Sequence, residues 1–285
     1  MLCRAMASGL LSPLPSPTQL VGNLFMITHP DTPLPKATQG RLSVMLAATL
    51  EDVRASQRLR YQVFAEEMGA QLHTEVAGLD VDAFDAHCEH LLVQDIVTQQ
   101  IVASTRILSD TAAQATGGFY SQTEFELSQV LAAPGRFMEI GRTCVHPDYR
   151  GGVALTLLWS GVARYMTTHQ FDYLMGCASV PLSQDKNSAW AVYAEVKDEY
   201  LSPPHLRVTP KLPLPPPSAP LPPVVIPPLL KAYLRLGVRI CGEPCWDPDF
   251  NVADVFVLLP VKQMESRYLK HFVIQGALAG GQSDA

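Results

Sequence analysis

The chain has 285 residues, of which 47% are hydrophobic, and a formal net charge of -6. This length allows a large buried core in one domain or two. The negative charge argues against nucleic acid as the main partner, because phosphate binding requires clustered lysine and arginine. The six cysteines lack the spacing of a small secreted domain and indicate reduced thiols. No apolar run approaches the roughly 20 residues of a membrane-spanning helix, so we expect a soluble, cytoplasmic protein and leave open a peripheral membrane contact.

The first half of the chain predicts a strand, a long helix and a hairpin. Residues 1–38 carry proline, serine and threonine without periodicity, which predicts a disordered N-terminal segment. Residues 41–47 predict a strand. Thr49 and Asp52 have the spacing of a capping box that opens a helix through Phe64. Further along, residues 90–96 and 101–108 predict an antiparallel hairpin, and residues 124–131 predict a short helix.

The next elements alternate between strand and helix. Residues 137–145 and 173–179 predict strands, and residues 154–168 and 188–196 predict helices. This order indicates an α/β domain over residues 39–200. Between the strand at 137–145 and its following helix lies a glycine-containing turn, which we expect to present backbone N–H groups to an anion.

Proline dominates the following segment. Residues 203–228 hold twelve of the 24 prolines, so we predict an extended polyproline linker over residues 201–228 rather than core secondary structure. Residues 228–237 then predict a helix with proline near its start and glycine at its end. With a final strand at residues 253–259, they form a predicted C-terminal extension, residues 229–275, that packs on the core. Residues 276–285 predict a flexible tail.

The most informative stretch is residues 137–145, a half-buried strand that carries Glu139 and Arg142 among apolar neighbours. Ionised side chains are rarely buried without a partner or a task. Residues three apart on a regular strand face opposite sides of the sheet, so the two can share a site only if the strand bulges between them. Gly141 tolerates such a bulge, and bulges often re-aim side chains beside active sites.

Other charged residues in apolar surroundings complete a set of mixed charge. The set comprises Arg60, Asp82, Asp85, Arg106, Glu139 and Arg142. One interpretation is a site that holds a zwitterion. The other is a structural ion-pair network, since such networks also perturb acids and bases. The pattern alone leaves both open.

Further motifs have two interpretations each. Trp246, Asp247 and Asp249 form either a lid or amine pocket, or a turn with Asx-type caps. Tyr193 is either a general acid or a core tyrosine, and the latter is the commoner case. Possible metal ligands at His87, Cys88 and His90, and at Cys241 and Cys245, lack a full ligand set, so we predict no metal site.

Several of these residues also carry a resemblance. The order of several charged and aromatic residues resembles that in the acyl-homoserine-lactone synthases, which share the GNAT acyltransferase fold. These residues are Arg60, Phe64, Asp82, Asp85, Arg106, Glu139 and Arg142. Longer stretches resemble more specifically the L-ornithine N-alpha-acyltransferases. These stretches are residues 58–70, 119–125, 171–179, 227–237 and 246–254. The resemblance extends over about residues 40–272.

This resemblance implies a GNAT-like α/β fold, with a central mostly antiparallel sheet flanked by helices and a C-terminal extension. It also implies transfer of a 3-hydroxyacyl chain from acyl carrier protein to the alpha-amine of L-ornithine, giving lyso-ornithine lipid, with no further cofactor. GNAT enzymes bind pyrophosphate with an Arg-x2-Gly-x-Gly/Ala loop, whereas the glycines of Arg150–Ala154 are out of register. This departure favours acyl carrier protein over coenzyme A as the donor. A quorum-signal synthase and a non-catalytic acyl-carrier-binding module are the alternatives.

Within that activity each candidate residue has an expected role. Glu139 is the expected general base, because the alpha-amine is largely protonated near neutral pH. Arg142 and Arg60 are expected to hold the acceptor carboxylate or the phosphopantetheine phosphate. Asp82 and Asp85 are expected to hold the acceptor's side-chain amine, with Asp247 and Asp249 setting the choice of acceptor. Asp254 is among the acidic residues beside the final strand that could pair with the second ammonium of a diamine acceptor. Phe64 and Arg106 complete the predicted substrate-binding set.

Overall fold

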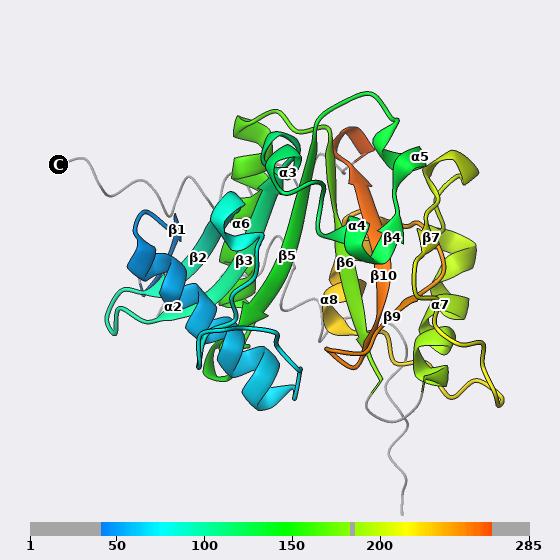
Figure 1. Ribbon diagram of the computed structural model, residues 1–285, viewed down its shortest axis with the longest axis horizontal. Helices are drawn as coiled ribbons and strands as arrows, with labels where there is room; N and C mark the ends of the chain where they lie inside the picture. Colours follow the sequence, from blue (N-terminus) through cyan, green and yellow to red (C-terminus); the bar gives the residue numbers. More distant parts are fainter. Residues whose placement is uncertain (1–40, 183–185, 264–285) are drawn as a thin grey trace, which may run out of the picture.

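The computed structural model describes residues 41–182 and 186–263 (Figure 1). The predicted disordered segment 1–38 and the predicted tail 276–285 lie outside the described residues. No helix among the residues that the structure describes is long and apolar enough to cross a membrane.

A single eight-stranded sheet forms the centre of the fold, with the order β1-β2-β3-β5-β6-β10-β8 and β9 paired to β10 (Figure 1). All its neighbouring strands are antiparallel except β5 and β6, which are parallel, so the predicted mostly antiparallel sheet is confirmed. The strands are β1 (Leu42–Leu46), β2 (Glu89–Asp95), β3 (Ile101–Ser109), β5 (Phe137–Val145), β6 (Tyr173–Pro181), β8 (Arg239–Ile240), β9 (Cys245–Asp247) and β10 (Val252–Pro260).

Helices cover both faces of this sheet. They are α2 (Leu50–Tyr61), α3 (Asp110–Ala115), α4 (Ser121–Glu124), α5 (Ser128–Leu131), α6 (Val153–Thr168), α7 (Asn187–Tyr200) and α8 (Pro228–Arg235). The alternation of side chains along β2 shows how the two faces are used. Leu91 and Val93 belong to the apolar cluster of α6 and α8, whereas Leu92 belongs to the cluster of α2.

Helix α2 begins and ends as its sequence dictates. The Thr49 side chain accepts the Asp52 N–H and the Asp52 carboxylate accepts the Thr49 N–H, so the predicted capping box is confirmed. The helix continues beyond Tyr61 as a π-helical segment, Gln62–Glu67. Such wider turns are rare and often lie at functional sites. Here the segment carries Phe64 into the wall of a cavity.

The predicted bulge in β5 is present. Ser104 of β3 pairs with Cys144, and Arg106 pairs with Gly141. The two strands therefore differ by one residue between these pairs, and the extra residue lies on β5. The positive φ of this irregularity, 52°, falls on Arg142 rather than on Gly141. The extra residue brings the side chains of Glu139 and Arg142 to the wall of the same cavity.

Strands β5 and β6 are paired only at one end. Their register runs from Phe137↔Tyr173 to Glu139↔Met175 and then stops. Gly176 lies where the strands begin to separate, and a Cβ atom there would come 2.5 Å from the Ile140 carbonyl oxygen. Beyond this point the edge of β5 that faces β6 has no strand partner, which leaves room for a ligand between the strands.

One prediction about local structure needs correction. Residues 124–131 are not one helix, because Phe125–Glu126 forms β4 and pairs with β7 (Thr209–Pro210). The proline-rich segment is mostly irregular, as predicted, although β7 lies within it and Leu214 is buried. In the described part of the predicted extension, the final strand β10 lies between β6 and β8 in the central sheet.

Candidate active site

A cavity of about 730 Å³ opens between the separated ends of β5 and β6, a volume typical of small-molecule sites. Its apolar wall comes largely from α6 and α8. That wall includes Leu155, Trp159, Val162, Ala163, Met166, Leu229, Tyr233 and Leu236. Ionisable side chains line the polar wall: Arg106, Tyr120, Glu124, Glu139, Arg142, Asp247 and Asp254. The cavity therefore combines a long apolar surface with a charged region.

Glu139 is held by the turn that begins α4. The Ser121 N–H donates to Oε1 at 2.8 Å, the Ser121 hydroxyl donates to the same oxygen, and the Tyr120 N–H donates to Oε2 at 2.7 Å. The side chain is 3% exposed, and burial raises its pKa despite these donors. An ionised carboxylate accepts about four hydrogen bonds, so one acceptor position remains on Oε2.

The guanidinium of Arg142 lies between two aromatic rings. Its Cζ atom is 5.0 Å from the ring centre of Tyr120 and 4.8 Å from that of Phe250. Its Nε is 3.3 Å from Asp80 Oδ2, and its Nη2 donates to Asp82 Oδ2 at 3.5 Å. These contacts hold a buried cation at the cavity wall, where an anionic group of a ligand can reach it.

Behind Arg142 lies a buried network of alternating charges. Asp85 accepts from Arg60 at 2.8 Å and 2.9 Å and from Arg106 at 2.9 Å. Arg60 also binds Asp80, and Arg106 also binds Asp82. Burial by itself would raise the pKa of Asp85, but the hydrogen bonds and charges of Arg60 and Arg106 outweigh it and lower that pKa.

This network bears on the two interpretations of the charged set. Arg60, Asp82 and Asp85 do not line the cavity, and their polar atoms face one another. Gln57 and the Asp82 N–H also donate to Asp85, which leaves its carboxylate no free position for a substrate. The geometry favours an ion-pair network for these three, whereas Glu139, Arg142, Arg106 and Phe64 reach the cavity.

The two predicted acceptor-binding aspartates are placed differently. Asp247 lines the cavity, and its Oδ1 also accepts the N–H groups of Asp249 and Phe250, so it is both an Asx-type cap and a cavity residue. Asp249 lies away from the cavity wall, with Oδ2 at 3.0 Å from Nε2 of His73. Tyr193 also lies outside the cavity wall and packs against Trp190.

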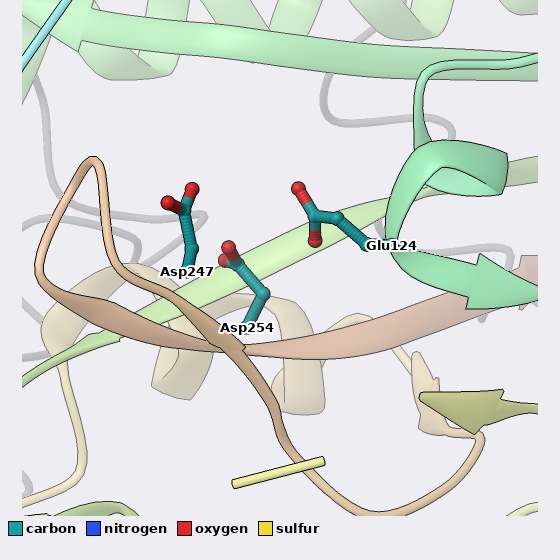
Figure 2. Close-up of side chains that lie close together, drawn as sticks. All are labelled: Glu124, Asp247 and Asp254. Atoms are coloured by element: carbon teal, nitrogen blue, oxygen red, sulfur yellow. The ribbon is translucent and has the colours of Figure 1, made fainter. Parts of the chain in front are cut away.

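Sequence analysis did not single out Glu124 of the cavity wall, but it did name Asp254 among the acidic residues beside the final strand that could pair with the second ammonium of a diamine acceptor. Glu124 of α4 and Asp254 of β10 lie beside Asp247, and the three side chains point toward one another (Figure 2). Burial and the negative charge of Asp247 raise the pKa of Asp254 to about 7, although a hydrogen bond from Ser179 opposes this. Burial and the charge of Asp254 raise the pKa of Glu124 as well. An aspartate in the apolar strand 252–260 was the available signal.

Comparison with known proteins places this site in a family. The family model described as an acetyltransferase (GNAT) domain matches residues 59–160. An L-ornithine N(alpha)-acyltransferase of Rhizobium meliloti (strain 1021) is 37% identical over 256 residues, which are 84% of this chain and 86% of that protein. Another, of Brucella abortus (strain 2308), is 35% identical over 254 residues, 82% of this chain and 89% of that protein. The chain belongs to the L-ornithine N(alpha)-acyltransferase family.

The solved structures agree on the fold. The CoA-dependent acyl-homoserine lactone synthase BjaI superimposes with a TM-score of 0.51 at 15% identity, over 85% of this chain and 90% of that chain. At this identity the likeness shows the fold alone. The chain is thus an N-acyltransferase with the GNAT fold, and the predictions of fold class and enzyme class are confirmed.

Proposed function

We propose that this acyltransferase moves a 3-hydroxyacyl chain from acyl carrier protein to the alpha-amine of L-ornithine, giving lyso-ornithine lipid. The observation that carries the proposal is the cavity, where an apolar wall adjoins Glu139 and Arg142. The apolar wall suits an acyl chain, and the charged wall suits an amino acid. The names of the family members support ornithine as the acceptor.

The reaction is direct attack of a neutral amine on the thioester. Glu139, directly or through one water, takes the proton of the alpha-amine at the open position of Oε2. A carbon–nitrogen bond forms, the carbon–sulfur bond breaks, and the departing thiolate of the carrier takes the proton that Glu139 accepted, which restores the base. The edge of β5 beyond Glu139, unpaired with β6, supplies backbone groups that bind the donor and polarise its carbonyl.

Arg142 holds the acceptor's carboxylate in this proposal, because its guanidinium reaches the cavity and is fixed from behind. Arg60, Asp82, Asp85 and Arg106 serve as positioning residues that fix the guanidinium and the bulge. They do so through the ion pairs that join them to Asp80 and to one another.

Acyl carrier protein is the proposed donor in preference to coenzyme A. Arg150 is paired with both carboxylate oxygens of Glu67, at 2.6 Å and 2.7 Å, so a pyrophosphate would have to compete with Glu67 for it. No other cofactor is proposed. Because the product carries a long acyl chain, we also propose that the enzyme acts in the cytoplasm with a peripheral contact to the membrane.

The test uses the purified enzyme with 3-hydroxyacyl-carrier protein or the matching acyl-coenzyme A, and mass spectrometry of the products. We expect N-acylornithine, formed with higher catalytic efficiency from the carrier protein. Equal or better use of coenzyme A would refute the donor assignment. An acyl lactone formed from S-adenosylmethionine, or no product, would refute the acceptor assignment.

A further inference from the structure

Three carboxylates in the cavity have no part in the mechanism above. Glu124, Asp247 and Asp254 each offer an oxygen within 4.8 Å of the others, and Figure 2 shows their carboxyl groups close together. They come from α4, β9 and β10, so elements far apart in the sequence build this carboxylate cluster. All three line the cavity.

The cluster has few donors for the carboxyl oxygens that it brings together. Asp254 is 3% exposed, and the Ser179 hydroxyl donates to its Oδ1 at 2.7 Å. Both carboxylate oxygens of Glu124 are buried, and no described residue meets full hydrogen-bond geometry with them, while the nearby Cys177 thiol and Tyr120 hydroxyl still lower the pKa of Glu124. No ion pair between described residues includes a member of the cluster. The raised pKa values of Glu124 and Asp254 follow from this burial, and a cation bound among the three groups would favour their ionised forms.

We propose that the carboxylate cluster binds the side-chain ammonium of a diamino-acid acceptor and so selects such acceptors over mono-amino acids. This inference rests on the proposed function. An ammonium has three N–H donors in tetrahedral directions. Donor–acceptor distances of about 2.8 Å place the three acceptors about 4.6 Å apart, and the three oxygens of the cluster lie within 4.8 Å of one another.

The position of the cluster relative to Glu139 suits such an acceptor. Ser121 at the start of α4 donates to Glu139, and Glu124 ends the same helix three residues later. Three residues of helix rise about 4.5 Å. The three methylenes of ornithine separate its Cα from its side-chain nitrogen by about 5 Å. Glu139 and the cluster line the same cavity, so an acceptor of this length can present its alpha-amine to Glu139 and its second ammonium to the cluster.

The test compares ornithine with 2-aminopentanoate, which has the same chain length without the second amine. The variants are Glu124→Gln and Asp254→Asn, and the exposed Glu126→Gln is the matched control. We expect the kcat/KM ratio of ornithine to 2-aminopentanoate to fall at least tenfold in both variants and to stay unchanged in the control. A ratio unchanged in Glu124→Gln and Asp254→Asn would overturn the proposal. Glu124→Gln keeps the shape of the side chain and removes a buried acid beside Asp254, so the variant should melt no lower than the wild type.

Calorimetry without any donor separates this inference from the proposed function. The probes are 1,4-diaminobutane and calcium chloride, titrated into the wild type and the same variants. Diamine binding that weakens at least tenfold in Glu124→Gln supports the role of the cluster. If the wild type nevertheless acylates neither amino acid, only the proposed function is refuted. Undetectable diamine binding, or binding that the variants leave unchanged, overturns the role of the cluster. Calcium binding that disappears in the variants also overturns it and assigns the cluster to a metal.

Discussion

Asp85 lies at the centre of the buried ion-pair network, and its replacement by asparagine tests what the network contributes. The change keeps the shape of the side chain and removes one charge that faces Arg60 and Arg106 at 2.8 Å and 2.9 Å. The side chains of both arginines are at most 4% exposed, so water cannot replace the lost charge. Breaking a buried pair from one side costs about 3–5 kcal/mol.

That cost is a large share of an ordinary folding free energy of about 5–15 kcal/mol. Urea unfolding measures it. With an m-value of about 3 kcal/mol per molar, the midpoint of Asp85→Asn should fall by about 1–2 M at pH 7. The matched control is Glu67→Gln, which breaks the exposed pair with Arg150 and should cost no more than about 1 kcal/mol.

The pH dependence gives a second check on the same residue. The pKa of Asp85 is lower in the folded protein than the unfolded value of about 3.9. Its contribution is therefore fully present above that value and is lost as the pH falls toward the folded-state pKa. The stability difference between the wild type and Asp85→Asn should shrink between about pH 5 and pH 3. A difference below about 1 kcal/mol at pH 7, or one that grows on acidification, would refute the reasoning.

Three further predictions concern the cavity. Glu139→Gln should lower kcat at least a hundredfold with an unchanged circular dichroism spectrum, because it removes the proton acceptor; unimpaired turnover at saturating acceptor would exclude that role. Gly176→Ala places a Cβ atom 2.5 Å from the Ile140 carbonyl oxygen and should lower the free energy of unfolding, measured by thermal unfolding, by about 1–3 kcal/mol. The control Gly151→Ala, whose Cβ atom would meet no atom within 4 Å, should leave the stability unchanged, and equal effects of the two substitutions would contradict the contact at Gly176. Arg142→Lys should raise the KM for the acceptor about tenfold or more, since lysine loses the planar fork held between two rings, and an unchanged KM would show that the carboxylate binds elsewhere.

The β5 bulge was predicted from the sequence, but its backbone conformation was not. Two ionisable residues three apart on an apolar strand required an irregularity, and the register of β5 contains it. The positive φ nevertheless fell on Arg142, because the two rings and the aspartates that hold its guanidinium determine the backbone there. Local preference pointed to Gly141, and tertiary contacts overrode it.

Contacts between distant segments account for what the sequence did not show. Phe125–Glu126 forms a strand only because Thr209–Pro210 lies beside it, more than 80 residues later. The carboxylate cluster depends in the same way on the pairing of β9 with β10, which sets Asp247 opposite Val252 and brings it near Asp254. No local pattern in the chain encodes these pairings, whereas the long helices and the β2–β3 hairpin follow from periodicity and turn residues alone.

The place of β10 in the sheet has a consequence for how the enzyme is made. Strand β6 shares three residue pairs with β5 but nine with β10, which is synthesised last among the described strands. A chain that ended before residue 252 would leave β6 as a long apolar edge open to other chains. The same truncation would remove Asp254 from the cavity. Strand β10 therefore both completes the charged wall of the cavity and protects β6 from pairing with other chains. A chain that lacks β10 should be inactive and prone to aggregate.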